Sequence, residues 1–299
     1  MTTTITSPDV LIEVRDLRKV FHRGGRDLVA VEGASFEMVR GRNLGIVGES
    51  GSGKSTTARM IMGLEQATSG SVRVCGEDMT VPARSARARR RRAKLTQMVY
   101  QDPFGSLDAR QTVASCLREV LRIHGPASSS ERERRIAELC DLVGLTAVQR
   151  ERSPKDLSGG QRQRVAIARA LAVEPEIVVL DEAVAALDIS IQAQILNLLV
   201  DVQRETGTGY VLISHDLAVV GHLTDDVVVM RNGRIVEQGP TARVLTEPAD
   251  EYTRILRDSV PSLDWRTPGV LEAVARQVGP RGEFATTGMA VPSAIEGKQ

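Results

Sequence analysis

The sequence predicts an α/β fold built on a sheet of parallel strands with helices on both faces. Residues 177–180 and 210–213 are solid apolar runs without the alternation of a half-exposed strand, as expected for parallel strands buried on both faces. Apolar residues at helical spacing over 191–202 predict a helix between these two runs. A strand, a glycine-rich loop and a helix follow one another over residues 43–64, which is a third mark of this fold class.

In order along the chain, the polar residues 1–9 are expected to form a flexible N-terminus, and strands are then predicted before the first helix. Glycines separate the strand-like runs, as expected at turns. The first helix is predicted at residues 54–64. The expected strands of this region are 10–17, 29–39, 43–48 and 72–76.

The middle of the chain is predicted to be mainly helical, after a strand at residues 95–101. A hairpin that turns at Asn232–Gly233 and two short helices within 240–258 are predicted near the C-terminal end. The expected helices of the middle region are 111–123, 131–145 and 162–172.

Charge and aromatic content argue against generic nucleic-acid binding. Lysine and arginine number 39 against 38 acidic residues, so the net charge of +1 does not indicate a polycation. Aromatic residues make up 3%, too few for a protein that stacks bases on many rings. The run RSARARRRRAK at residues 84–94 is an exception, since it fits a nucleic-acid patch, a site for anionic lipid headgroups or a solvated surface helix. We favour the surface helix.

The three cysteines, Cys75, Cys116 and Cys140, are far apart and form no CxxC pair. This pattern indicates reduced thiols and gives no evidence for a disulfide framework or a zinc site. We expect all three to lie on apolar faces in the core. No apolar run reaches the roughly 18 residues of a membrane-spanning helix, so no helix of this chain is expected to cross a membrane.

The segment after the third predicted strand matches GxxxxGK[ST], a phosphate-binding pattern. Glycines in such a loop let successive backbone N–H groups turn toward phosphate oxygens, and the following helix presents its positive end to the same anion. Lys54 can reach the β- and γ-phosphates of a nucleotide, and the Ser55 hydroxyl can bind Mg²⁺. The candidate binding residues are Gly48, Glu49, Ser50, Gly51, Ser52, Gly53, Lys54, Ser55 and Thr56.

A second pattern is the acidic pair Asp181–Glu182 at the end of a predicted buried strand. An acid at this position can hold Mg²⁺ through its water shell. The neighbouring Glu182 can orient and deprotonate an attacking water. Such a pair standing alone is more often a helix cap. Beside the glycine-rich loop, it predicts a nucleotide-hydrolysing site.

The five residues LSGGQ at 157–161 allow a family to be named. Over residues 10–262, the chain resembles the ATP-binding subunits of ABC transporters. The resemblance implies a P-loop NTPase core with an antiparallel β subdomain and an inserted helical subdomain at about 102–160. The Pro-, Gly- and Thr-bearing sequence at 263–299 predicts a partly disordered extension. Four further positions match motifs of that family: Gln101 at the Q-loop, Asp188 in the D-loop 186–188, His215 at the switch histidine and Phe21 at the adenine-stacking aromatic.

The resemblance implies that ATP and Mg²⁺ are the cofactors. Lys54 would neutralise phosphate charge, Glu182 would be the general base, and His215 would contact the γ-phosphate. Contacts to the γ-phosphate exist with ATP and are lost after hydrolysis, so ATP would close a pair of such subunits and hydrolysis would open it. The implied metal-binding residues are Ser55, Gln101 and Asp181.

The family also packs two such subunits head to tail, so that each ATP lies between the glycine-rich loop of one chain and the signature of the other. Asp188 would then lie at the seam between the subunits. The signature follows a loop and opens a helix, where backbone donors favour an anion. The implied donors to the partner's ATP are Ser158, Gly159, Gly160 and Gln161.

Three further segments resemble the di- and oligopeptide importer branch of this family. They are QDPFGSLDAR at 101–110, DISIQAQILNLL at 188–199 and EYTRILRDSVP at 251–261. The implied partners are a second ATP-binding subunit, identical or related, transmembrane permease subunits and a solute-binding protein, with this chain peripheral at the cytoplasmic face of the membrane. No nucleic-acid partner is expected. Export, a non-transport ATPase acting on nucleic acid and a non-catalytic regulatory subunit stay open as alternatives.

The chain departs from the branch at three positions. Ala183 and Ala185 stand where the branch usually has proline and serine, which changes the fine structure expected before the D-loop. At the adenine-stacking position, Phe21 replaces the commoner tyrosine, so a ring is kept and a hydroxyl is lost.

Overall fold

The computed structural model describes residues 10–23, 26–102, 105, 107–126, 128–185 and 187–259. The predicted flexible N-terminus at 1–9 and the predicted extension at 263–299 lie outside the described residues. Across the described ranges, no helix combines the length and the apolar character that a membrane crossing requires.

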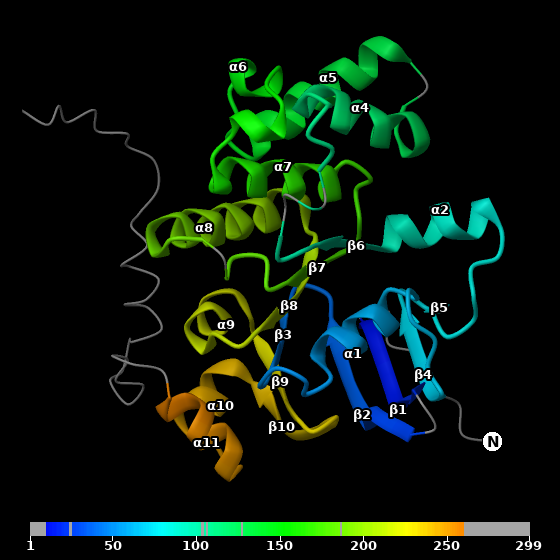
Figure 1. Cartoon of the computed structure of the whole chain (residues 1–299), viewed down its shortest axis with the longest axis vertical. Helices are drawn as coiled ribbons and strands as arrows, with labels where there is room; N and C mark the ends of the chain where they lie inside the picture. The colour runs from blue at the N-terminus through cyan, green and yellow to red at the C-terminus, as the bar shows by residue number, and fades with distance from the viewer. Residues whose placement is uncertain are drawn as a thin grey trace, which may run out of the picture.

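A six-stranded sheet forms the centre of the fold, with the strand order β10-β9-β3-β8-β7-β6 (Figure 1). β3 is parallel to both β8 and β9, and β7 is parallel to both β8 and β6, as the α/β prediction requires. β10 runs antiparallel to β9. The strands are β3 Leu44–Val47, β6 Thr96–Val99, β7 Ile177–Asp181, β8 Gly209–Ser214, β9 Asp226–Arg231 and β10 Arg234–Pro240.

A second, four-stranded sheet is antiparallel and has the order β2-β1-β4-β5. β1 pairs with β2 on one side and with β4 on the other, and β4 pairs with β5. This sheet is the antiparallel β part that the family resemblance implies. Its strands are β1 Val10–Arg23, β2 Arg26–Val39, β4 Ser69–Val74 and β5 Glu77–Asp78.

Helices flank both sheets. In Figure 1, α4 to α7 gather at the upper end with α8 beneath α7, while α9, α10 and α11 lie beside β9 and β10. α4 to α6 fall within residues 102–160, and the limits of the helical subdomain assigned there stay a prediction. The helices are α1 Lys54–Ile61, α2 Ala86–Leu95, α4 Val113–His124, α5 Ser129–Leu142, α6 Ala147–Arg150, η1 Pro154–Asp156, α7 Gly159–Leu171, α8 Ile189–Thr206, α9 Leu217–Leu223, α10 Thr241–Thr246 and α11 Glu251–Asp258.

The central sheet separates two hydrophobic cores, which explains why its strands show no alternation in the sequence. Along β7, Val178 and Leu180 belong to the core that α4, α5, α7 and α8 share. Ile177 and Val179 belong to the other core, which includes α1 and the second sheet. A side chain of β7 is therefore buried on whichever face it lies, as in parallel sheets covered on both sides.

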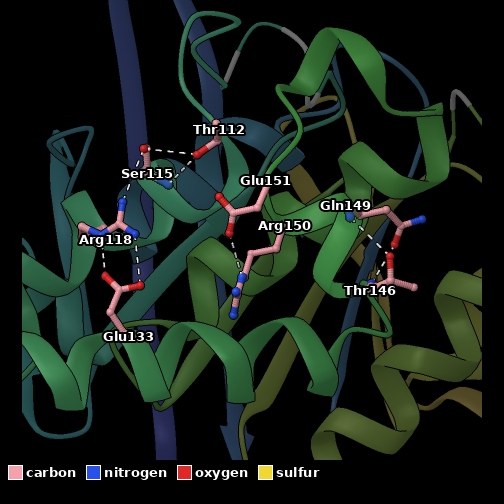
Figure 2. Close-up of polar contacts among 8 residues, drawn as sticks. All are labelled: Thr112, Ser115, Arg118, Glu133, Thr146, Gln149, Arg150 and Glu151. Carbon is pink, nitrogen blue, oxygen red and sulfur yellow. Dashed lines mark hydrogen bonds and ion pairs between the residues drawn. The ribbon is translucent and has the colours of Figure 1, made fainter.

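Polar contacts define the ends of the helices between β6 and β7 (Figure 2). The Thr112 hydroxyl caps the N-terminus of α4, and Thr146 and Gln149 form a reciprocal capping box at α6. Between α4 and α5, Arg118 donates two hydrogen bonds to Glu133, at 2.6 and 3.1 Å. An exposed ion pair of this kind adds little stability, so burial of the apolar faces supplies most of the packing energy here.

Two sequence expectations have different outcomes. Most of the arginine-rich run forms α2, on which Arg87 and Arg90 are exposed and Arg92 is buried. The expected helix is therefore present, and the preference for a solvated surface over a nucleic-acid or lipid site stays a prediction. The expectation for Cys75 is wrong: this thiol is exposed, whereas Cys116 and Cys140 are buried as expected. Val72 and Val74 of β4 are buried and Arg73 is exposed, so this alternation already places position 75 on the exposed face, and Cys75 follows the strand in the turn to β5 with a left-handed φ of 49°.

Asn43, immediately before β3, joins that strand to α8, α9 and β8. Its side-chain nitrogen donates to Gln203 Oε1 at 2.9 Å and to the Leu223 carbonyl at 2.8 Å. Its side-chain oxygen accepts from Gln203 Nε2 at 2.7 Å and from the Tyr210 N–H at 2.9 Å. The residue is 3% exposed, and its amide uses both donors and both acceptor positions. These bonds fix the start of the strand that leads into the glycine-rich loop.

Asn43→Ala is expected to lower the free energy of unfolding by about 2–4 kcal/mol, because it leaves a buried carbonyl and a buried N–H without partners. Urea unfolding followed by circular dichroism measures this loss. Gln194→Ala, at an exposed position of α8, is the control and is expected to change stability by less than about 0.5 kcal/mol. Equal losses in the two variants would contradict the role given to Asn43.

Candidate functional site

Three of the predicted site segments meet at one edge of the central sheet. β3, β8 and β7 are parallel neighbours, so their carboxyl ends lie side by side. The glycine-rich loop 48–53 follows β3, the pair Asp181–Glu182 ends and follows β7, and His215 follows β8. The carboxyl edge of a parallel sheet is the usual binding crevice of α/β proteins. The structure therefore brings together residues that lie far apart in the sequence.

The glycine-rich loop rests on the hairpin formed by β9 and β10. Gly48 has a φ of 146°, and a Cβ placed on it would lie 2.1 Å from the Met230 carbonyl oxygen. Further along the loop, the Ser52 carbonyl accepts the Gly233 N–H at 3.0 Å. A side chain at position 48 would displace the loop or the strand end, so glycine is required there by close backbone approach.

Lys54, the first residue of α1, folds back over the loop. Its ammonium donates to the carbonyl oxygens of Gly48 and Glu49, each at 2.7 Å. The residue is 6% exposed, and burial lowers its pKa, while the carboxylates of Glu182, Asp181 and Glu49 act in the opposite direction. The ammonium is thus held inside the loop and close to the acidic groups of the site.

The N-terminus of α1 offers donors that no side chain of the loop uses. Gly53 occupies the N-cap position with a φ of 104° and makes no side-chain capping bond. Ser52 Oγ is buried, and no hydrogen-bond partner for it lies within the described residues. Helix N–H groups and an unpaired hydroxyl next to a lysine form a place where an anion can bind.

Ser55 and Asp181 link the loop to β7. The Ser55 hydroxyl donates to Asp181 Oδ1 at 3.3 Å. Burial raises the pKa of the Asp181 carboxyl, and the Ser55 hydrogen bond opposes this rise. Among the described residues, no three His, Cys, Asp or Glu side chains gather as a protein-only metal site. The Ser55 hydroxyl and the Asp181 carboxylate are oxygen donors of the kind Mg²⁺ takes, because this ion uses one or two protein carboxylates and completes its shell with phosphate and water oxygens.

Glu182 and His215 form the second half of this edge. His215 Nδ1 lies 3.4 Å from Glu182 Oε1. Glu182 adopts a left-handed φ of 48°, and its N–H donates to the Ile213 carbonyl at 3.0 Å. Both side chains line a small cavity of about 80 Å³. A carboxylate held in an unusual backbone conformation next to an imidazole is a suitable acceptor for a proton from water.

The LSGGQ segment lies at the start of α7, among the upper helices of Figure 1, whereas α1 lies beside the second sheet. Ser158 Oγ accepts the Gln161 N–H at 3.3 Å, and Gln161 Oε1 accepts the Ser158 N–H at 3.0 Å. A Cβ on Gly160 would lie 2.6 Å from Ile191 Cγ2 of α8, so glycine permits this helix contact. The segment thus presents Ser158 and Gly159 at a capped helix N-terminus.

Three further predicted site residues, Gln101, Asp188 and Phe21, lie on three different elements. Gln101 is exposed two residues after β6, at the end of the sheet beyond β7. Asp188 is exposed at the N-cap position of α8 and makes no side-chain capping bond, while Ala186 of the D-loop lies outside the described residues. On β1, the Phe21 ring has the Lys19 ammonium 4.7 Å from its centre. A cation therefore covers one side of the ring proposed to stack on adenine.

Residues 31–185 match the family description "ABC transporter". Over 263 residues, the chain is 46% identical to the oligopeptide transport ATP-binding protein OppD of Mycobacterium tuberculosis, covering 85% of this chain and 42% of that protein. Also over 263 residues, it is 42% identical to the di/tripeptide transport ATP-binding protein DppF of Pseudomonas aeruginosa, covering 88% of this chain and 80% of that protein.

Among solved structures, the ATP-binding cassette MJ0796, dimeric in a post-hydrolysis state with ADP and Pi, is similar with a TM-score of 0.69 and 27% identity. This likeness covers 77% of the present chain and 99% of that one. The chain therefore belongs to the ABC transporter family, and its fold is that of an ATP-binding cassette. It spans less than half the length of the OppD relative.

Two contributors to the site were not predicted. The carbonyl of Met230 lies so close to Gly48 that it excludes a side chain there, and a backbone group of this kind leaves no signal in residue type. The Tyr252 hydroxyl accepts the Glu49 N–H at 2.9 Å, although the two residues are separated by 203 positions. The segment containing Tyr252 is recognisable as a mark of the importer branch, but its sequence does not reveal this contact.

Gly48→Ala is expected to lower the free energy of unfolding by about 3–5 kcal/mol, since it combines a glycine-only φ with a backbone clash. Gly41→Ala is the matched control, because Gly41 has a φ of 79° and a Cβ placed on it would meet open space. Its expected loss is about 1–2 kcal/mol from backbone strain alone. Thermal and chemical unfolding of both variants measure the difference, and similar losses would contradict the close packing described for Gly48.

Proposed function

We propose that this chain is the ATP-binding and ATP-hydrolysing subunit of a transporter that imports di- or oligopeptides or a related small solute. The proposal is carried by one observation: the glycine-rich loop, Asp181, Glu182 and His215 converge at the carboxyl ends of three neighbouring strands. Hydrolysis requires an anion site, a metal site and a base within one crevice, and this convergence supplies residues suited to each.

In this proposal, the triphosphate of ATP binds to the loop 48–53 and the first turn of α1. The N–H groups at the helix N-terminus and the Lys54 ammonium supply positive charge around the phosphate oxygens. The Gly233 N–H bonds the Ser52 carbonyl from behind the loop, and the Met230 carbonyl lies close against Gly48. This support favours a site whose shape exists before the nucleotide arrives.

Mg²⁺ would be held by Ser55 and Asp181, whose oxygens lie 3.3 Å apart, with the Gln101 side chain as a further oxygen donor from the end of β6. When bound, the ion would neutralise charge on the β- and γ-phosphates. Glu182 accepts a proton from water as the water oxygen bonds to the γ-phosphorus. The bond from that phosphorus to the bridging oxygen breaks, which yields ADP and phosphate. His215 orients Glu182 and contacts the γ-phosphate.

A second ATP-binding subunit completes the proposed site. Ser158, Gly159, Gly160 and Gln161 would supply a hydroxyl, a side-chain amide and backbone donors to ATP that is held by the partner's loop. Asp188, exposed at the start of α8, would lie at the seam. The dimeric state of the similar cassette MJ0796, seen with ADP and Pi, supports a site built between two subunits.

The substrate class and the other partners are proposed from similarity. The relatives named above are an oligopeptide transport protein and a di/tripeptide transport protein, which favours peptide import over export and over an activity on nucleic acid. Transmembrane permease subunits would supply the pathway, and a solute-binding protein would deliver the substrate. The chain would then act as a peripheral protein at the cytoplasmic face, where ATP is available.

Glu182→Gln is expected to slow ATP hydrolysis by about 10²–10⁴-fold, because an amide of the same shape cannot accept the proton. ATP affinity, measured by calorimetry, is expected to stay unchanged. Phosphate release under saturating ATP measures the rate. The control is Glu151→Gln at the exposed end of α6, which is expected to hydrolyse ATP normally. Turnover near the wild-type rate in Glu182→Gln would overturn the assignment of the base.

The same Glu182→Gln variant is expected to shift from monomer to dimer when Mg²⁺-ATP is added, since trapped ATP bridges two subunits. Light scattering on the purified chain measures this shift. A monomer that still binds ATP would show that the second subunit is a different chain, and co-purification with related subunits would follow. A variant that does not bind ATP at all would contradict the proposed function.

A further inference from the structure

Glu49, the second residue of the glycine-rich loop, makes a backbone hydrogen bond to a side chain of α11, 203 positions later in the sequence. Tyr252 lies in the first turn of α11 and is 2% exposed. Its hydroxyl oxygen accepts the backbone N–H of Glu49 at 2.9 Å. Burial raises the pKa of the Tyr252 phenol, so the neutral hydroxyl makes this contact at physiological pH.

The ring of Tyr252 is held against the same hairpin that supports the loop. The guanidinium carbon of Arg231, the last residue of β9, lies 4.7 Å from the centre of the ring. A guanidinium over an aromatic face is an attractive contact. The preceding residue, Met230, is the one whose carbonyl approaches Gly48. The ring of Tyr252 thus contacts the end of β9, and its hydroxyl contacts the glycine-rich loop that packs against that strand.

The helix that carries Tyr252 is itself fixed. Glu237 of β10 accepts the Ala249 N–H at 2.8 Å and the Asp250 N–H at 3.1 Å, immediately before α11. Arg257, at the other end of the helix, donates to the Thr246 carbonyl at 3.2 Å. The Tyr252 hydroxyl is therefore presented from a helix held at both ends, and it can restrict the motion of the loop residue that it contacts.

Glu49 is consequently held on both sides. Tyr252 bonds its N–H, and the Lys54 ammonium bonds its carbonyl oxygen at 2.7 Å. We propose that Tyr252 is a positioning residue of the nucleotide site: its hydroxyl fixes the Glu49 peptide and so keeps the glycine-rich loop in its phosphate-receiving shape before ATP binds. This inference rests on the proposed function of the loop, and it gives the C-terminal α11 a part in ATP affinity.

The test is Tyr252→Phe, which deletes the hydroxyl and keeps the ring on Arg231. One neutral hydrogen bond corresponds to about a three- to tenfold change in affinity, so the Kd and KM for ATP are expected to rise by that factor. The kcat at saturating ATP is expected to be unchanged, because the loop supports ground state and transition state alike. Hydrogen exchange at the Glu49 amide is expected to accelerate.

Tyr210→Phe is the matched control. The Tyr210 hydroxyl is also buried and donates to a backbone carbonyl, that of Leu199, at 2.9 Å, but it lies between β8 and α8. Its loss is expected to reduce stability as much as Tyr252→Phe does and to leave KM and Glu49 exchange unchanged. Equal KM values for the two variants, or a fall in kcat without a rise in KM for Tyr252→Phe, would overturn the inference.

Lys54→Ala separates this inference from the proposed function. One possible result is that Lys54→Ala loses Mg²⁺-ATP binding while Tyr252→Phe and Tyr210→Phe have the same KM for ATP. This result would overturn the positioning role of Tyr252 and leave the proposed nucleotide site standing. Wild-type ATP binding in Lys54→Ala would show that the loop is not the nucleotide site, and both proposals would then fail.

Discussion

The position of the glycine-rich loop depends on the close approach of two backbones at Gly48 and Met230. The parallel ladder pairs Val47 with Val229, so the residue that leaves β3 meets the residue after its partner on β9. A Cβ at position 48 would lie 2.1 Å from the Met230 carbonyl, which glycine alone avoids. Sheet register thus determines where the loop lies, and the loop determines where Lys54 and Ser55 can act.

Much of the site was predictable because its chemistry lies in short segments that follow strands. Asp181, Glu182 and His215 follow buried apolar runs, and parallel neighbours bring such ends to one edge. Contacts between distant segments were not predictable in this way. Tyr252 and Asn43 act through hydrogen bonds to backbone groups far away in the sequence, and no periodicity encodes those partners. The wrong expectation for Cys75 has a different cause, because the alternation of Val72, Arg73 and Val74 already places position 75 on the exposed face of the strand.

In the signature segment, one hydroxyl caps a helix and, in the proposed site, would also bind a ligand. Ser158 Oγ accepts the Gln161 N–H and so closes the capping box of α7. A serine hydroxyl has one donor and two acceptor positions, so its proton stays available after capping. The same geometry that begins the helix therefore leaves a donor free for a ligand, beside the backbone of Gly159. Removing this side chain would disturb the helix and the proposed binding site together, so simple deletion would not separate the capping role from the proposed one.

In the proposed nucleotide site, the two carbonyl bonds of Lys54 would determine how ATP is received. Without a nucleotide, the Lys54 ammonium already has hydrogen-bond partners, because the Gly48 and Glu49 carbonyl oxygens accept from it. Arrival of a phosphate is then an exchange of oxygen partners, and the affinity gained is the difference between two solvated states. An arrangement of this kind keeps the buried cation compatible with the fold between turnovers, and it lets the nucleotide leave without exposing an uncompensated charge.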